Sequence, residues 1–268
     1  MARVSRNAFY EWLRKPFKAP SDNELKLIGL FNEKNARYGV RRLKMAYERR
    51  FKVLINIKKI KRIKRDFGLI TRIRKKNKFR AIFIKGEEHK VAPNLVQRNF
   101  SPTKDMNILS VDITELIYKG GRKAYLFVMK ELRNRSIGHY KLMERPTLDL
   151  VVEGLQDYLM SIPKEIREKT IIHSDQGFHF TSYQFRSILK ICGVKQSMSR
   201  KGNCLDNAPV ESFFGHLKDE SEYRACDTFK EVKGVVKKYM RYYNHERPQW
   251  SLERKTPAEA GVYVSLVL

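Results

Sequence analysis

Residues 107–132 read NILSVDITELIYKGGRKAYLFVMKEL, and this stretch decides the class of fold. Two runs rich in β-branched and aromatic residues flank the short polar sequence KGGRK. This pattern is typical of two strands joined by a turn. A third strand-like run, RSIGHYKL, follows at 135–142. The sequence therefore predicts that this region begins with three consecutive strands.

Helical and strand-like patterns alternate after the third strand. Residues 146–163 suit a helix with Thr147 as its N-cap, and KTIIHSD (169–175) suits a short buried strand. An amphipathic helix over 181–193, a strand over 194–199 and a helix that begins near 206–208 complete the series. Three strands followed by alternating elements predict an α/β fold with a mixed sheet and helices on both faces.

The region before this sheet has the pattern of a small helical domain. Ser21 suits an N-cap, with Glu24 three residues later as its capping-box partner, and the pattern breaks near Tyr38-Gly39. A third helix begins after Asn56 and ends at Gly68. Its apolar face is expected to carry Ile57, Ile60, Ile63 and Phe67.

The third helix is also strongly basic. The face opposite its apolar residues is expected to carry six cations: Lys58, Lys59, Lys61, Arg62, Lys64 and Arg65. Three helices, the last of them apolar on one side and basic on the other, are typical of a helix-turn-helix DNA-binding domain. The alternative is a solvated charged face, although cations this close together repel one another.

The charge distribution indicates a polyanionic partner. The chain has a net charge of +27, and residues 1–100 contain 29 Lys and Arg against 8 Asp and Glu. Nucleic acid, a membrane surface or a ribosome-like basic surface could each explain the excess, and nucleic acid is favoured. We expect a DNA-binding region at 1–70, a basic linker at 71–104, a catalytic core at 105–225 and a helical extension at 226–268.

Composition excludes several other classes of protein. A hydrophobic fraction of 42% in 268 residues indicates a folded chain. No apolar run approaches the roughly 20 residues that cross a bilayer, and the start lacks a signal-peptide pattern. Cys192, Cys204 and Cys226 are too widely spaced for a zinc site or a disulfide framework. A reducing cytoplasm and no membrane association are therefore expected.

Three acidic residues are candidates for a metal site. Asp112 interrupts the first strand, Asp175 ends the fourth, and Glu211 opens the last helix of the core. If the two strands lie side by side, both aspartates reach one end of the sheet. Three carboxylates in one place repel unless a cation neutralises them, and hard oxygen ligands suit Mg²⁺ or Mn²⁺. Each acid also has a structural reading: a strand-edge acid, a turn residue and a helix-dipole partner.

The last helix carries further candidate residues on one face. Pro209 suits its first turn, and Lys218 lies seven residues, about two turns at ~3.6 residues per turn, after Glu211. Asn207 joins the same stripe if the helix extends back that far. A metal-binding acid with a lysine further along the helix suits a groove for phosphates. The alternative for Lys218 is a solvated side chain.

These residues and their flanking sequences resemble DDE transposases and retroviral-type integrases, and most closely the second-frame transposases of insertion sequences of family three. The resemblance rests on VDIT (111–114), HSDQG (173–177), SRKGNCLDNAPVESFFGHLKDE (199–220) and YYNHERPQWSLERKTPAEA (242–260). SRNAFYEW (5–12) and RYGVRRL (37–43) resemble that family's N-terminal helix-turn-helix segment, so Arg41 and Arg42 join the expected DNA-contacting residues.

The resemblance implies a ribonuclease H-like core that cuts and joins the inverted-repeat ends of a mobile element. It implies that Asp112, Asp175 and Glu211 are the catalytic metal ligands, with two Mg²⁺ or Mn²⁺ ions, and that Lys218 and Asn207 contact DNA. The expected partners are double-stranded DNA, a second copy of the chain, and an upstream-frame helix-turn-helix product or fusion. The expected location is the bacterial cytoplasm, at the nucleoid. Alternatives are a hydrolytic nuclease of the same fold and a non-catalytic DNA-binding relic.

Overall fold

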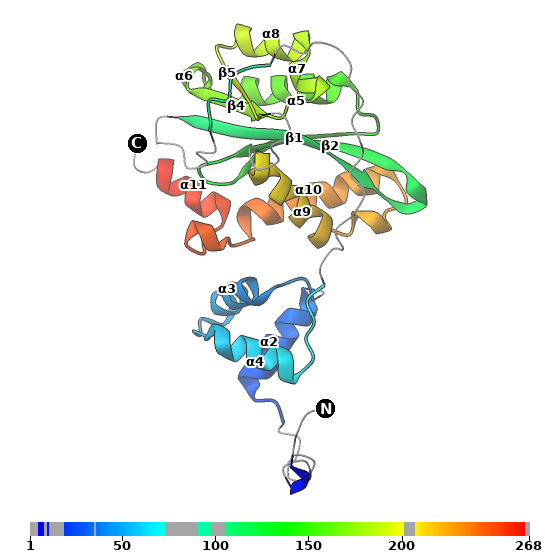
Figure 1. Cartoon of the computed structure of the whole chain (residues 1–268), viewed down its shortest axis with the longest axis vertical. Helices are drawn as coiled ribbons and strands as arrows, with labels where there is room; N and C mark the ends of the chain where they lie inside the picture. Colours follow the sequence, from blue (N-terminus) through cyan, green and yellow to red (C-terminus); the bar gives the residue numbers. More distant parts are fainter. Residues whose placement is uncertain are drawn as a thin grey trace. The chain divides into compact units, whose positions relative to one another are not determined.

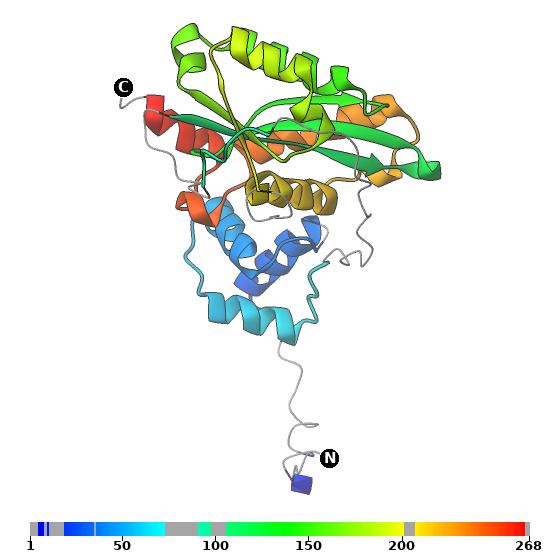
Figure 2. The same ribbon diagram turned by 45° about the horizontal axis from the view of Figure 1, so that its top comes forward.

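The computed structural model describes residues 5–7, 10, 19–34, 36–72, 91–97, 106–200 and 207–265. The chain divides between Arg72 and Ile73 into two compact units (Figures 1 and 2), which are described separately.

Between residues 19 and 72, the described part of the first unit contains three helices, as the sequence predicts: α2 (Asp22–Glu33), α3 (Val40–Phe51) and α4 (Ile57–Asp66). Both the main-chain and the hydroxyl group of Ser21 donate to Glu24, and the Asn56 side chain accepts from the Lys58 N–H, so both predicted caps are confirmed. The three helices enclose one apolar core, formed by Leu27, Leu30, Phe31, Tyr38, Leu43, Tyr47, Ile55, Ile60 and Ile63.

The second unit is built on a five-stranded mixed sheet in the order β3-β2-β1-β4-β5. The strands are β1 (Asn107–Ile117), β2 (Lys123–Glu131), β3 (Ile137–Met143), β4 (Thr170–Ser174) and β5 (Lys195–Met198). The first three pair antiparallel, whereas β4 pairs parallel with both β1 and β5. The predicted mixed sheet is confirmed.

Helices cover both faces of this sheet (Figure 1). On one face, α5 (Leu148–Ser161) and α8 (Tyr183–Ile191) pack on Leu109, Val111 and Phe127. On the other face, α9 (Ala208–Glu220) and α10 (Phe229–His245) pack on Leu116, Leu126 and Val128. Alternate residues of β1 and β2 therefore face different layers. The remaining helices are α6 (Lys164–Glu168), α7 (Phe178–Thr181) and α11 (Pro257–Ser265), with short 3₁₀ turns at Lys119–Gly121, Tyr223–Ala225 and Trp250–Leu252.

Residues 91–97, inside the predicted linker 71–104, lie against the edge of the sheet. The Leu95 N–H donates to the Ser197 hydroxyl at 2.9 Å, and the Met198 N–H donates to the Pro93 carbonyl at 3.3 Å. Val96 is buried with Ile108. This part of the predicted linker is thus attached to the core. Residues 73–90 and 98–105 lie outside the described residues.

Two further expectations can be compared with the structure. Thr147 occupies the N-cap position of α5, but its side chain makes no capping hydrogen bond. Its hydroxyl contacts the Met143 sulfur instead, at 3.9 Å. Among the described residues, no helix combines the length and apolar character that a membrane span requires.

Candidate active site

The sheet register brings Asp112 and Asp175 to the same level on neighbouring strands. The parallel pairing of β1 and β4 ends with Ser110 opposite His173. Asp112 and Asp175 each follow two residues later. Asp112 has the same parity along β1 as Leu116, so both side chains leave the sheet on the face that α9 covers. The predicted adjacency of the two aspartate-bearing strands is confirmed.

A tight turn after β4 orients Asp175. One carboxylate oxygen accepts the Gly177 N–H at 2.9 Å, and the Gln176 side chain donates to the Ser199 carbonyl. A Cβ atom added to Gly177 would lie 2.9 Å from the same Asp175 oxygen, so only glycine fits here without displacing the carboxylate. The interpretation of Asp175 as a turn residue is therefore confirmed, and its carboxylate is exposed.

The third acid enters from the start of α9. Pro209 lies in the first turn, as the sequence predicts, and Glu211 follows on an exposed position of that turn. Asn207, at the N-cap position, ties this end of the helix to β1. Its side-chain oxygen accepts from the Ser110 hydroxyl at 2.5 Å, and its NH₂ donates to the Val111 carbonyl at 3.3 Å. These bonds attach α9 directly beside Asp112.

The side chain of Asn207 has a different position from the one expected. The sequence predicts a DNA contact for it, but it is buried, and both polar atoms bond to β1. In the structure its role is to position the start of α9. Lys218, two turns after Glu211, lies close enough to stabilise the charged form of Asp112. The expected stripe of Glu211 and Lys218 along one helix is thus present.

The pKa of Asp112 responds to burial and to the charges of neighbouring ionic groups. Burial raises the pKa of Asp112 to about 7, and the neighbouring charge of Asp175 adds to the rise. Glu211 raises it further, whereas the hydrogen bond from the Ile113 N–H and the charge of Lys218 lower it. Two acids, from the β4 turn and α9, therefore act on Asp112 of β1, and Lys218 opposes them.

The donor set suits a hard divalent cation. Carboxylate oxygens with uncompensated negative charge are the ligands that Mg²⁺ and Mn²⁺ prefer. Among the described residues, no three His, Cys, Asp or Glu side chains form a group that could hold a metal ion. The chemistry of the residues fits a metal, and the ligand assignment remains a prediction.

Three buried charged residues that the sequence analysis did not single out hold α9 in place: Glu220, Arg247 and Lys130. Arg247 makes two hydrogen bonds to Glu220, at 2.9 and 3.0 Å, and both side chains are almost fully buried. Lys130 of β2 is buried beneath the first turn of α9. Arg247 lies within residues 242–260, one of the stretches that carry the family resemblance. This position could have indicated its importance. No sequence pattern indicated the burial of Lys130, since lysines near the end of a strand are usually exposed.

His173 lies inside the sheet rather than at the carboxylates. Its Nδ1 is 2.9 Å from the Ser197 hydroxyl, which also accepts from the Leu95 N–H. The residue is 1% exposed. His173 is therefore a packed histidine at the end of β4.

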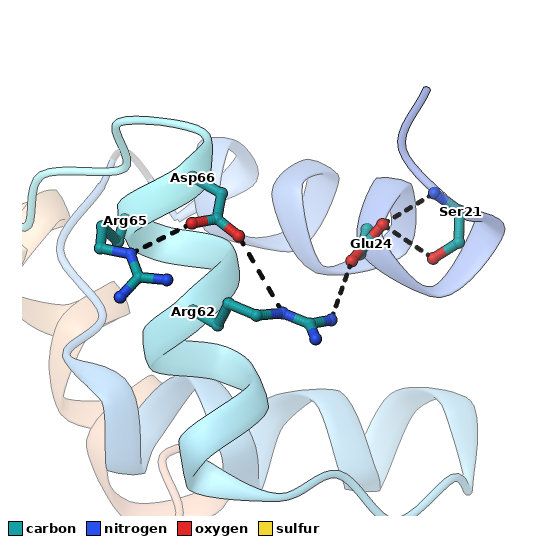
Figure 3. A network of polar contacts seen from close by, with 5 residues as sticks. All are labelled: Ser21, Glu24, Arg62, Arg65 and Asp66. Carbon is teal, nitrogen blue, oxygen red and sulfur yellow. Dashed lines mark hydrogen bonds and ion pairs between the residues drawn. The ribbon is translucent and has the colours of Figure 1, made fainter. Parts of the chain in front are cut away.

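The basic residues of α4 in the first unit differ in their exposure and in their ion pairs. Lys58, Lys61, Arg62 and Arg65 are exposed, and Lys59 is half-buried. Arg62 pairs with Glu24 and Asp66, and Arg65 also pairs with Asp66 (Figure 3).

Lys64 does not lie on this face. Its ammonium group lies 4.0 Å from the ring centre of Phe31 and donates to the Thr71 hydroxyl. Burial lowers the pKa of Lys64. On α3, Arg41 is exposed and Arg42 stacks on Tyr38 at 5.4 Å. The expected basic surface therefore lacks Lys64.

Known proteins share both units of this chain. Family models match an "HTH-like domain" at residues 21–77 and an "Integrase core domain" at residues 102–204 and 192–257. The "Putative transposase InsK for insertion sequence element IS150" of Escherichia coli K12 is 37% identical over 96% of this chain and 90% of its own length. The "Transposase for insertion sequence element IS904" of Lactococcus lactis is 30% identical over 94% and 99%.

Among solved structures, the HTLV-2 integrase catalytic core domain in complex with magnesium is similar, with a TM-score of 0.46 and 17% identity over 60% of this chain and 97% of that one. The order of an HTH-like unit followed by an integrase core, together with identity to insertion-sequence transposases over almost the whole length, places this chain in their family: it is a DDE-type transposase of the insertion-sequence group that includes the IS3 and IS150 proteins.

Proposed function

We propose that Asp112, Asp175 and Glu211 bind divalent metal ions, two Mg²⁺ or Mn²⁺, and that the site cuts and joins DNA at the inverted-repeat ends of an insertion sequence. The observation that supports this is that the charges of Asp175 and Glu211 both act on the buried Asp112. The β1–β4 register aligns the two aspartates, and Asn207 fixes the start of α9 beside Asp112. A purely structural role gives no reason for mutually repelling carboxylates at one point.

The chain's own residues would orient the reactants and balance charge. Bound metal ions would supply activation of the attacking oxygen and neutralisation of the leaving oxygen. Asp112 and Asp175 hold fixed positions on the sheet, Asp175 through its bond from Gly177. Lys218 lies along the same helix as Glu211 and suits a contact with a phosphate of the bound strand. Phosphoryl transfer depends mainly on such positioning and charge neutralisation, so no Ser or Cys nucleophile is required.

Two successive transfers account for cutting and joining. In the first, a water oxygen attacks the phosphorus, the bond from phosphorus to the 3′ oxygen breaks, and a free 3′-OH remains. In the second, that 3′-OH attacks a phosphodiester of the target strand, and the target's own 3′ oxygen leaves. One site performs both because only the attacking hydroxyl differs.

DNA recognition is proposed for the first unit. The exposed cations of α4 and Arg41 of α3 form a basic surface in a unit of helix-turn-helix type. Contacts from these side chains to phosphates would hold the element end. Because transposition joins two ends, a DNA-bound dimer is the expected active assembly.

A strand-transfer assay tests the proposal. Duplexes that carry the element's inverted repeat followed by flanking DNA, labelled at the 5′ end of the strand that is cut and transferred, are incubated with target plasmid and Mg²⁺, with EDTA as the control. Transposition gives label joined to the plasmid. Shortened label without joining would indicate a hydrolytic nuclease. Bound but uncut DNA in Mg²⁺ and in Mn²⁺ would exclude the catalytic assignment and indicate a DNA-binding relic.

A further inference from the structure

Helix α10 presents a row of cations that the active site does not use. Of its 17 residues five are basic and one, Glu231, is acidic. Glu231 is engaged at its own end of the helix, where it accepts from the Thr228 hydroxyl and the Asp227 N–H. We name the α10 cation face for the exposed basic residues Lys230, Lys233, Lys237, Lys238 and Arg241.

This face borders a groove on the outer strand of the sheet. A cavity of about 450 Å³ lies between α10 and β3, the edge strand. Its wall consists of Ile137, Gly138, His139, Tyr140, Lys237, Met240, Arg241 and Asn244. The Asn244 side chain holds the rim in shape, because it both accepts from the Ile137 N–H and donates to the Ile137 carbonyl.

Packing within the second unit involves Lys233, whose ammonium group lies 4.7 Å from the ring centre of Phe229, but it does not account for the rest of the row. In the part of the chain that the structure describes, Lys230, Lys237, Lys238 and Arg241 make no ion pair or side-chain hydrogen bond. Lys233, Lys237 and Arg241 follow at intervals of four residues, a spacing at which like charges cost a helix about 0.2–0.5 kcal/mol per pair. The buried side of α10, with Val232, Val236 and Tyr239, is sufficient to dock the helix.

The groove lies near the carboxylates. Asp112 is opposite Val128 on β2, and Val128 is opposite Tyr140 on β3. Tyr140 therefore lies two strands from Asp112, roughly 10 Å at the usual ~4.8 Å strand spacing. From Lys230 to Arg241 the helix rises about 16 Å at 1.5 Å per residue. One DNA strand presents a phosphate about every 3.4 Å of duplex axis, so the row matches about five phosphates.

We propose that the α10 cation face and the adjoining β3 groove bind the phosphate backbone of duplex DNA, as a second DNA-binding surface separate from the helix-turn-helix unit. The inference relies on the proposed function only for the class of partner. Its position beside the carboxylates suits DNA that continues past the reacting phosphate. Binding through phosphates is independent of base sequence, so this surface serves any duplex.

The test uses the full-length chain in EDTA, so that no cutting occurs, and a 30-base-pair duplex of random sequence. Affinity is measured between 50 and 300 mM salt for wild type and for Lys237→Gln/Arg241→Gln. We expect the slope of the log–log salt plot to fall by about two units in the double variant, near 0.9 for each phosphate released. Lys190→Gln/Lys195→Gln is the matched control. It removes two exposed charges from α8 and β5 and is expected to leave the slope unchanged.

Two results would overturn the proposal: equal slopes for the two double variants, or a Lys237/Arg241 variant that no longer self-associates in sedimentation while its DNA slope is intact. The second result would assign the surface to a protein partner. The outcome is distinct from that of the strand-transfer assay. A changed slope without any joined product would support this surface and contradict the proposed function, and joined product with an unchanged slope would do the reverse.

Discussion

The ammonium group of Lys130 on β2 donates a hydrogen bond to the carbonyl oxygen of Pro209, in the first turn of α9, at 2.8 Å. Lys130 is 5% exposed and also lies 5.8 Å from the ring centre of Tyr243 on α10. Burial lowers the pKa of Lys130 to about 7, and Arg135 and Arg247 lower it further. The helix that carries Glu211 thus rests on a buried amine that titrates near neutral pH.

Lys130 should make stability depend on pH. Its pKa is lower in the folded chain than in the unfolded chain, so between about 7 and 10.5 the unfolded chain binds the extra proton. Stability therefore rises with pH across this window, with a slope of up to about 1.4 kcal/mol per unit. Lys130→Met should remove this part of the slope. Urea unfolding of both proteins at pH 6.5 to 9.5 measures the difference, and parallel curves would contradict it.

The buried pair of Arg247 and Glu220 should be costly to break. Arg247→Met removes two hydrogen bonds from the buried Glu220 carboxylate, which keeps the Tyr239 hydroxyl and the His216 ring as neighbours. We expect the free energy of unfolding, measured in urea, to fall by about 3–5 kcal/mol. The exposed pair of Lys119 and Asp227 is the control: Lys119→Met should cost less than about 1 kcal/mol. Similar costs for the two variants would show that burial is unimportant here.

Asp175→Asn should separate DNA binding from chemistry. Asparagine can still accept the Gly177 N–H, so the turn persists, but it lacks the negative charge that a metal ion requires. We expect cleavage of labelled element ends to fall more than about 1,000-fold, with DNA affinity within about threefold of wild type. Gel retardation in EDTA supplies the affinity. Cleavage at the wild-type rate would exclude Asp175 as a ligand.

Gly177→Ala should damage the site without removing any ligand. The backbone of Gly177 has φ −63°, which alanine adopts freely, so the only conflict is between the new methyl group and the Asp175 oxygen. We expect cleavage to fall about 10- to 100-fold while thermal stability changes little, because the displaced side chain is a proposed ligand and is exposed rather than part of the core. A matched Gly234→Ala change on α10, where a methyl group meets nothing within 4 Å, should leave cleavage intact.

The basic surface of α4 should contribute to the salt dependence of DNA binding. Replacing Lys58, Lys59 and Lys61 by Gln should lower the log–log slope by about 0.9 for each phosphate that these side chains neutralise in the wild-type complex. Lys64→Gln is the control within the same helix. Its ammonium group is engaged with Phe31 and Thr71, so this change should reduce stability and leave the slope unaltered. A slope change for Lys64→Gln alone would reverse the assignment.

The sheet and its acids could be predicted because both depend on local pattern. Alternating and continuous apolar runs marked the strands, and Asp112 stood out within one of them. Pro209 likewise marked the start of α9. Helical spacing alone would have placed Lys64 correctly. It lies four residues after Ile60 and three before Phe67, within the apolar stripe. Because Lys64 is a cation, it was assigned to the basic face, and this assignment is wrong.

Other features depend on tertiary contacts that no local pattern shows. The burial of Lys130 requires α9 and α10 to cover one end of β2, and the amide of Asn207 turns inward because Ser110 and Val111 lie beside it. The attachment of residues 91–97 to Ser197 likewise joins segments about 100 residues apart. Such pairings follow from the tertiary arrangement of the chain.

The order of the three acidic residues along the chain has a consequence for protein synthesis. Asp112 and Glu211 are 99 residues apart in sequence, and the third proposed ligand is translated after both aspartates. A nascent polypeptide on the ribosome contains the basic helices α3 and α4 before α9 is translated. If Glu211 is the third ligand, this polypeptide cannot break a phosphodiester bond until α9 has emerged and docked. On the proposed assignment, chromosome damage by incomplete translation products is prevented by the order of the chain itself, without a separate inhibitor.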